Sequence, residues 1–69
     1  MNDETRERLR GIARGVCDGE GWPWLQPVEI KKRWGKYLVI TNARSIGCNA
    51  RVEIDRKTLQ VIARCYAPR

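Results

Sequence analysis

The sequence predicts an α+β fold, in which one N-terminal helix packs on a four-stranded antiparallel meander sheet. Apolar residues recur at helical spacing before residue 18, and they alternate with polar residues in four later segments. A stretch with glycine, proline and tryptophan separates the two patterns. Short connections join the four segments, which favours antiparallel neighbours. With 69 residues and no linker or repeat, the chain is expected to be a single domain, residues 1–69.

The helix is expected to begin after Asn2 or Asp3, either of which is a suitable N-cap. Its apolar stripe comprises Thr5, Leu9, Ile12, Ala13, Val16 and Cys17. Gly11 and Gly15 lie inside this helix, where each costs about 1 kcal/mol relative to alanine. We expect the close approach of another surface to explain them.

The stretch from Gly21 to Pro27 contains two tryptophans, Trp22 and Trp24. Proline disfavours helical geometry in the residue before it, so this segment is expected to be extended or turned. Trp22 and Trp24 are two residues apart and point the same way in an extended chain. The favoured interpretation is a corner in which one or both rings close the core. The alternatives are a stacking platform for bases or a ligand and a patch that binds a partner.

Four strands are expected after this corner. The first covers residues 28–31 and ends at a hairpin turn over residues 32–36. The second covers residues 37–41 and has apolar groups on both faces, which indicates a central strand of the sheet. A loop over residues 42–47 precedes the third strand. The residues expected to face inward in the third and fourth strands are Cys48, Ala50, Val52 and Ile54, then Leu59, Val61, Ala63 and Cys65.

The positive charge is concentrated in the predicted sheet. The chain carries a net charge of +6. Residues 2–20 hold five acidic and four basic residues, a sum of −1, whereas residues 21–69 hold ten basic and three acidic residues, a sum of +7. We expect an open basic sheet face with Lys31, Arg51 and Arg64 as members, and this charge favours acidic partners. The candidate binding residues are Trp22, Trp24, Lys31, Arg33, Trp34, Arg51 and Arg64.

Several kinds of chemistry are not expected. The chain has no histidine, which removes Ser-His and Cys-His nucleophiles. Its three cysteines are widely spaced and form no zinc motif. We interpret them as buried free thiols, with a Cys17–Cys65 bridge left open. No catalytic residue, metal or cofactor is therefore predicted, and the protein is not expected to be an enzyme.

The order of elements resembles that of the small PepSY-like and cystatin-like domains, in which one helix packs on an antiparallel sheet. The segment Val52–Val61 looks like their recurrent hairpin, an Asp followed by two residues, Thr and a returning strand. Trp34–Val39 looks like their aromatic-led strand, and the whole is similar to short bacterial proteins with a Gly-Trp-Pro-Trp element after the helix. The chain departs from the hairpin pattern at Leu59, where Gly usually follows Thr. The resemblance implies a non-catalytic binding or inhibitory module.

Two functional hypotheses follow. The first is a protein-interaction module that acts through the open sheet face, an edge strand or self-association. The second is a nucleic-acid-binding protein whose tryptophans stack on bases. No apolar run approaches the roughly 18 residues of a membrane span, and no signal peptide is recognised at the N-terminus, so we expect a cytoplasmic protein without a membrane partner.

Overall fold

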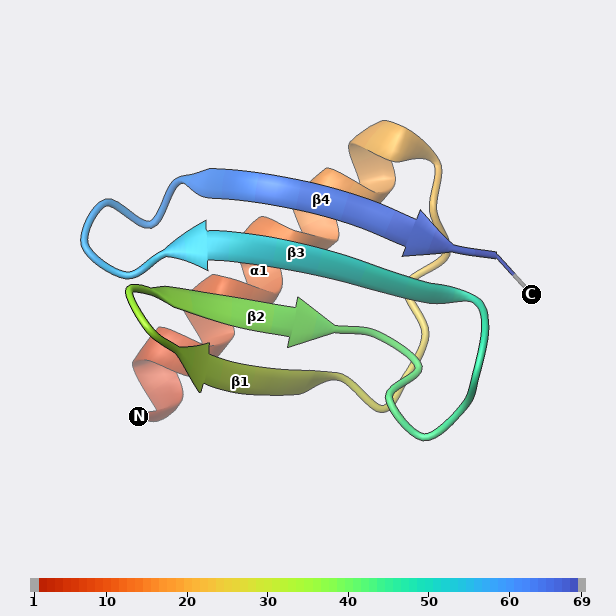
Figure 1. The fold of residues 1–69 in the computed structure, drawn as a ribbon, viewed down its shortest axis with the longest axis horizontal. Helices are drawn as coiled ribbons and strands as arrows, with labels where there is room; N and C mark the ends of the chain where they lie inside the picture. The colour runs from red at the N-terminus through yellow and green to blue at the C-terminus, as the bar shows by residue number, and fades with distance from the viewer. Residues whose placement is uncertain (1, 69) are drawn as a thin grey trace.

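A computed structural model describes residues 2–68, and Met1 and Arg69 lie outside the described residues. Helix α1 covers Asp3–Glu20 and is followed by strands β1 (Glu29–Arg33), β2 (Lys36–Ile40), β3 (Asn49–Asp55) and β4 (Val61–Ala67). The strands form one antiparallel sheet in the order β1-β2-β3-β4, and α1 crosses one face of it (Figure 1). The predicted α+β fold is therefore confirmed, including the central position of β2.

Both ends of α1 are capped by neighbouring residues. The side-chain oxygen of Asn2 accepts a hydrogen bond from the Thr5 N–H at 2.8 Å, which satisfies one free donor of the first turn. Gly21 ends the helix in the left-handed conformation, with φ of 76°. The Trp22 N–H then donates to the Cys17 carbonyl at 2.8 Å. These caps fix where the chain leaves the helix and enters the Trp-Pro segment.

The core lies between α1 and the two central strands. Leu9, Ala13 and Cys17 of α1 are completely buried, as are Val39 of β2 and Ile54 of β3. Trp24, Val28, Ile30 and Tyr37 are partly buried and pack around this cluster. The inward orientation predicted for Val28 and Ile30 is confirmed. Because antiparallel partners share a face, Val39 and Val52 place the alternate residues Leu38 and Ile40 on the opposite face of β2.

A register shift in β4 reverses the faces of its second half. Glu53 is opposite Ala63 and Ile54 is opposite Val61, so Ile62 is the extra residue of a β-bulge. After the bulge, Arg64 and Tyr66 share the helix side with Val52 and Ala50. The prediction that Ala63 and Cys65 face the core is wrong. Strict alternation assumes an unbroken register, and nothing in the residue pattern marks the bulge.

The glycines within α1 have no neighbour across from them. A Cβ atom placed on Gly11, Gly15 or Gly19 meets no other atom within 4 Å. The expected close approach of another surface is therefore wrong for the part of the chain that the structure describes. These positions carry the helix-propensity cost of glycine without a packing gain.

We predict that Gly15→Ala raises the free energy of unfolding by about 1 kcal/mol, because alanine removes backbone freedom from the unfolded chain. Gly35 is the matched control: its φ is +72°, so Gly35→Ala is expected to lower stability by about 1 kcal/mol. Urea denaturation of the two variants measures both effects. Destabilisation by Gly15→Ala would contradict the helix geometry described above.

Candidate functional site

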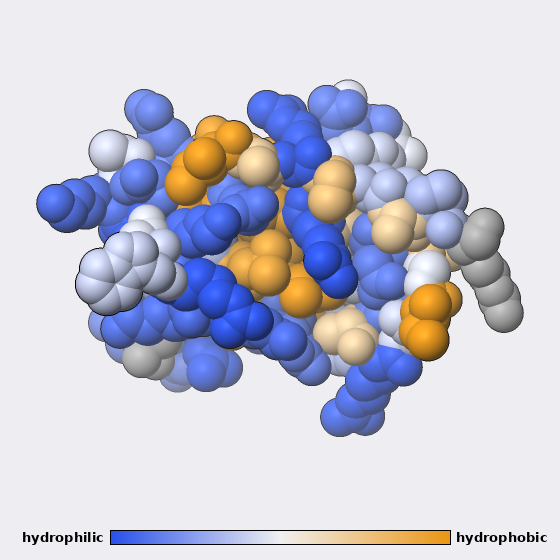
Figure 2. All heavy atoms as spheres, viewed as in Figure 1, coloured by the Kyte–Doolittle hydropathy of each residue, from blue (hydrophilic) through white to orange (hydrophobic). Residues whose placement is uncertain are grey.

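The face of the sheet that points away from α1, here called the outer face, is covered by no other element within residues 2–68. Three cross-strand rows occupy it: Glu29, Ile40, Arg51 and Cys65 in the first, Lys31, Leu38, Glu53 and Ala63 in the second, and Arg33, Lys36 and Asp55 in the third. Figure 2 shows this face with apolar atoms at its centre and hydrophilic side chains around them. Leu38 and Ile40 of β2 are only half-buried. The outer face thus combines an apolar centre with a charged border.

A hollow of about 460 Å³ lies on the outer face. It runs from the β1–β2 turn across the sheet to β4. Its lining residues are Arg33, Trp34, Lys36, Leu38, Arg51, Glu53 and Cys65. Three of them, Arg33, Trp34 and Arg51, are candidate binding residues that the fold brings together from separate parts of the chain.

The charges around the hollow are unequal. Lys36 forms a hydrogen-bonded ion pair with Glu53 across β2 and β3. Among the described residues, no carboxylate lies within ion-pair distance of Lys31, Arg33 or Arg51. Within residues 2–68, Glu29 is an unpaired carboxylate in the same rows, so the outer face has a small excess of positive charge, concentrated around the hollow. A bound acidic group is attracted by this charge, most strongly at low ionic strength.

Trp34 stands at one end of the hollow with almost its whole side chain in solvent. It occupies the two-residue turn Trp34–Gly35 between β1 and β2, and its exposed fraction is 98%. The positive φ of Gly35 closes this turn. A large ring exposed to this degree makes no packing contribution to the fold. Burial of such a ring against a partner is a strong source of binding energy.

The other two tryptophans belong to the helix side. Trp22 stacks on Tyr66 of β4, with ring centres 5.7 Å apart and an angle of 18° between the planes. Trp24 packs against the core cluster. Both rings are half-buried. The geometry therefore agrees with the corner interpretation of Gly21–Pro27 and removes Trp22 and Trp24 from the outer face.

Arg64 is not part of the outer face. It lies opposite the buried Val52, and its guanidinium is 3.5 Å from the Glu20 carboxylate at the end of α1. The prediction that places Arg64 on the open face is wrong, because the bulge at Ile62 shifts the alternation. Lys31 and Arg51 lie on that face as predicted. Sequence reasoning missed four lining residues, Lys36, Leu38, Glu53 and Cys65.

The three cysteines occupy different environments. Cys17 is buried beneath the sheet, and this burial, with the Asp18 carboxylate as a smaller cause, raises the pKa of its thiol. Cys65 is exposed on the outer face, so a Cys17–Cys65 bridge is excluded by the sheet between them. Cys48 is half-buried, and its side-chain hydrogen bond with Tyr66 raises the pKa of the Tyr66 hydroxyl. Burial of all three thiols, as predicted, therefore holds only for Cys17.

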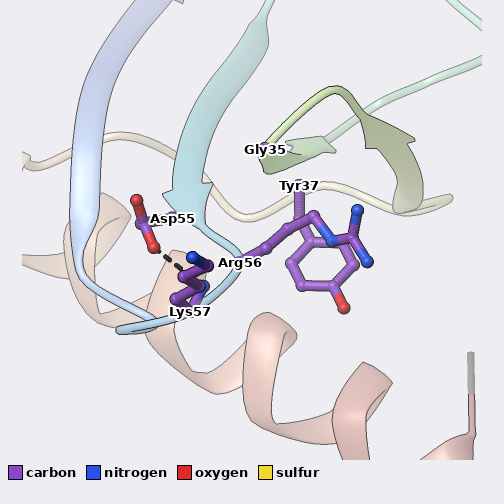
Figure 3. A pocket seen from close by; sticks show the side chains of 5 residues that line it. All are labelled: Gly35, Tyr37, Asp55, Arg56 and Lys57. Atoms are coloured by element: carbon purple, nitrogen blue, oxygen red, sulfur yellow. Dashed lines mark hydrogen bonds between the residues drawn. The ribbon is translucent and has the colours of Figure 1, made fainter.

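A second hollow of about 460 Å³ lies at the end of the sheet, lined by Gly35, Tyr37, Asp55, Arg56 and Lys57. Figure 3 shows the Arg56 side chain over the Tyr37 ring, and the guanidinium carbon is 5.8 Å from the ring centre. The Asp55 carboxylate accepts the N–H groups of Lys57 and Thr58 at 2.8 and 3.0 Å. Arg56 and Asp55 thus already interact with other residues of the protein, which makes this hollow a weaker candidate for a binding site than the outer face.

No family model, curated protein or solved structure matches the chain. The resemblance to PepSY-like and cystatin-like domains therefore stays a prediction. Within residues 2–68, no group of three or more metal-ligating side chains comes together. In the same residues, α1 lacks the apolar length that a membrane crossing requires.

We predict that Trp34→Ala changes the free energy of unfolding by less than about 0.5 kcal/mol, because the ring is exposed. Trp24→Ala is the matched variant and is expected to cost about 2 kcal/mol, because it removes a ring that packs on the core. Urea denaturation of both proteins gives the comparison. Equal losses in the two variants would show that Trp34 has a structural role.

The hydrogen bonds from Thr58 and Lys57 lower the pKa of Asp55 below its ordinary value of 3.8. The Asp55 carboxylate therefore binds a proton more weakly in the folded state than in the unfolded state. Its ionised form stabilises the fold at pH values above the unfolded pKa of 3.8, and this stabilisation is lost as the pH falls through the lower pKa of the folded state. Asp55→Ala is therefore expected to be less stable than the natural chain at neutral pH, with a difference that shrinks at about pH 2. Urea denaturation at the two pH values tests this, and a pH-independent difference contradicts it.

Proposed function

We propose that the protein is a small non-catalytic interaction module that binds an acidic protein partner through the outer face. One observation carries the proposal: Leu38 and Ile40 of the central strand β2 lie half-exposed on a sheet face that no other element covers in the described chain (Figure 1). The border of this face contributes Trp34, Lys31 and Arg33, and Arg51 lies beside Ile40 on the central strand β3. An apolar centre with a polar rim is the usual anatomy of a protein–protein interface.

The residue types at the border support a protein partner of negative charge. Tryptophan and arginine are the residues that most often dominate binding energy at protein interfaces, and Trp34, Arg33 and Arg51 surround one hollow. Lys31, Arg33 and Arg51 are available to opposite charge on a partner, because none is paired within the described residues. The expected occupant is an acidic surface that also presents an apolar side chain to Leu38.

The same cations also attract nucleic acid, but the centre of the face favours protein. Sheet platforms for single-stranded nucleic acid use aromatic rings on which successive bases stack. Here the corresponding positions of β2 are the aliphatic Leu38 and Ile40. Trp34 alone offers a stacking surface on this side.

The proposal retains a cytoplasmic location and the absence of catalysis as predictions. Free thiols such as Cys65 persist in a reducing compartment. The hollow holds the Lys36–Glu53 ion pair and the Cys65 thiol, but the chain has no histidine to serve as a base for that thiol. Binding, and inhibition or regulation through binding, is the activity that this set of residues supports.

The test is affinity capture from a native lysate before and after nuclease treatment, with Arg51→Glu, Trp34→Ala and the control Arg6→Glu. Arg6 is exposed on α1, so its variant has the same charge change as Arg51→Glu on a different surface. We expect a specific acidic protein that the natural chain and the control retain. After recovery of that protein, calorimetric titration is expected to give a dissociation constant at least about tenfold weaker for Arg51→Glu and for Trp34→Ala.

Two results would overturn the proposal. The first is equal binding by all four proteins, which means that the outer face is not involved. The second is complete loss of binding after nuclease treatment, which means that nucleic acid is the ligand. Unfolding measurements on each variant show whether a loss of binding comes from a loss of structure.

A further inference from the structure

The β4 strand forms one edge of the sheet and pairs only with β3 within residues 2–68. It is seven residues long, whereas the opposite edge strand, β1, is five residues long. Lys31, Lys32 and Arg33 blunt the β1 edge, since charged side chains on an edge strand oppose the addition of another strand. The only charged residue in β4 is Arg64, and Glu20 pairs with it. The two edges are therefore unequal, and β4 is the more receptive.

The direction of the free backbone groups in β4 follows from the hydrogen bonds of β3. The Thr41 N–H donates to the Ala50 carbonyl, and the Arg56 N–H donates to the Gly35 carbonyl. Ala50 therefore directs its backbone groups toward β2, and by alternation Arg51 directs its groups toward Cys65 of β4. The N–H and C=O groups of Arg64 and Tyr66 consequently point outward, away from β3.

Helix α1 gives this edge a partial cover. Figure 1 shows α1 running diagonally behind the sheet, from the side of β1 to a point beyond β4. A strand added next to β4 would therefore lie over the C-terminal end of α1, on the side of the sheet that the helix covers. In a two-fold pair of identical edges, a second copy brings its own projecting helix into the same space. The overhang thus favours an extended segment over a second copy of the chain.

The outer side of the edge continues into the hollow. Ala63 and Cys65 are small residues of β4 on the outer face, and Arg51 lies directly opposite Cys65 on β3. A long acidic side chain on a neighbouring strand meets no bulky side chain at Ala63 and Cys65 before it reaches the unpaired Arg51 guanidinium. The edge and the hollow therefore form one continuous surface.

We propose that the acidic partner supplies an extended segment that adds to β4 as a fifth strand of the sheet. The outward N–H and C=O groups of Arg64 and Tyr66 form its backbone hydrogen bonds, as in other cases of strand addition. Acidic side chains at alternate positions of the segment lie over Ala63 and Cys65 and pair with Arg51. This inference rests on the proposed function and specifies how the partner is held.

The test uses random twelve-residue peptides displayed on phage and selected on the full chain. We expect the selected peptides to carry acidic residues at alternate positions, and synthetic copies to lose binding when alternate backbone nitrogens are methylated. Amide hydrogen exchange supplies the decisive readout. In the free protein, we expect the Arg64 and Tyr66 amides to exchange fast and those of Ala63 and Cys65 to be protected by β3. Peptide binding is expected to slow the Arg64 and Tyr66 amides at least tenfold.

The outcomes separate this inference from the proposed function. Peptides that bind through Arg51 and Trp34 without protecting Arg64 and Tyr66 overturn the strand addition and leave the proposed function standing. Protection of both amides with unchanged binding by Arg51→Glu and Trp34→Ala supports the strand addition and contradicts the outer-face site. Protection in the free protein that rises with its concentration means that a second copy fills the edge, which overturns the inference. Selection of no peptide above a protein-free control overturns it as well.

Discussion

The packing of α1 on β2 and β3 is the interaction on which the rest of the structure depends. An isolated helix of this length, with three glycines in it, is marginal in water. Burial of a large aliphatic side chain contributes about 1.5–3 kcal/mol, and Leu9, Val39 and Ile54 are buried completely at this contact. The helix thus needs the sheet, and the sheet needs the helix to cover Val39, Val52 and Ile54.

This contact also determines where a binding surface is available. One helix covers one face of a four-stranded sheet, so the residues of β2 that alternate with the core residues remain at the surface. Those residues are Leu38 and Ile40, and the neighbouring strands place Lys31 and Arg51 beside them. The short β1–β2 turn then adds Trp34 at the border. The pairing register of the strands therefore puts these apolar residues and their neighbouring cations together on the face that α1 leaves uncovered.

The sequence allowed prediction of the features that depend on local periodicity, and it did not allow prediction of those that depend on register. The stripe of Leu9 and Ala13 and the alternation of Val52 and Ile54 gave the helix and the third strand correctly. The bulge at Ile62 had no signal, and so Arg64 and Cys65 were placed on the wrong faces. Leu59 is a related case: its φ is +59°, the left-handed conformation that glycine favours, at the position where the resembling hairpins usually carry glycine.

A partner bound to the outer face would cover the exposed Cys65 thiol, so the reactivity of this thiol reports directly on the proposed binding. The measurement is the rate of alkylation of Cys65 by iodoacetamide, for a trace of the protein in a native lysate of the cells that express it and for the purified protein at the same pH. Cys48, half-buried beside Tyr66 and outside the hollow, is the internal reference. The account predicts that the lysate slows Cys65 at least tenfold relative to Cys48. An unchanged ratio of the two rates would contradict it.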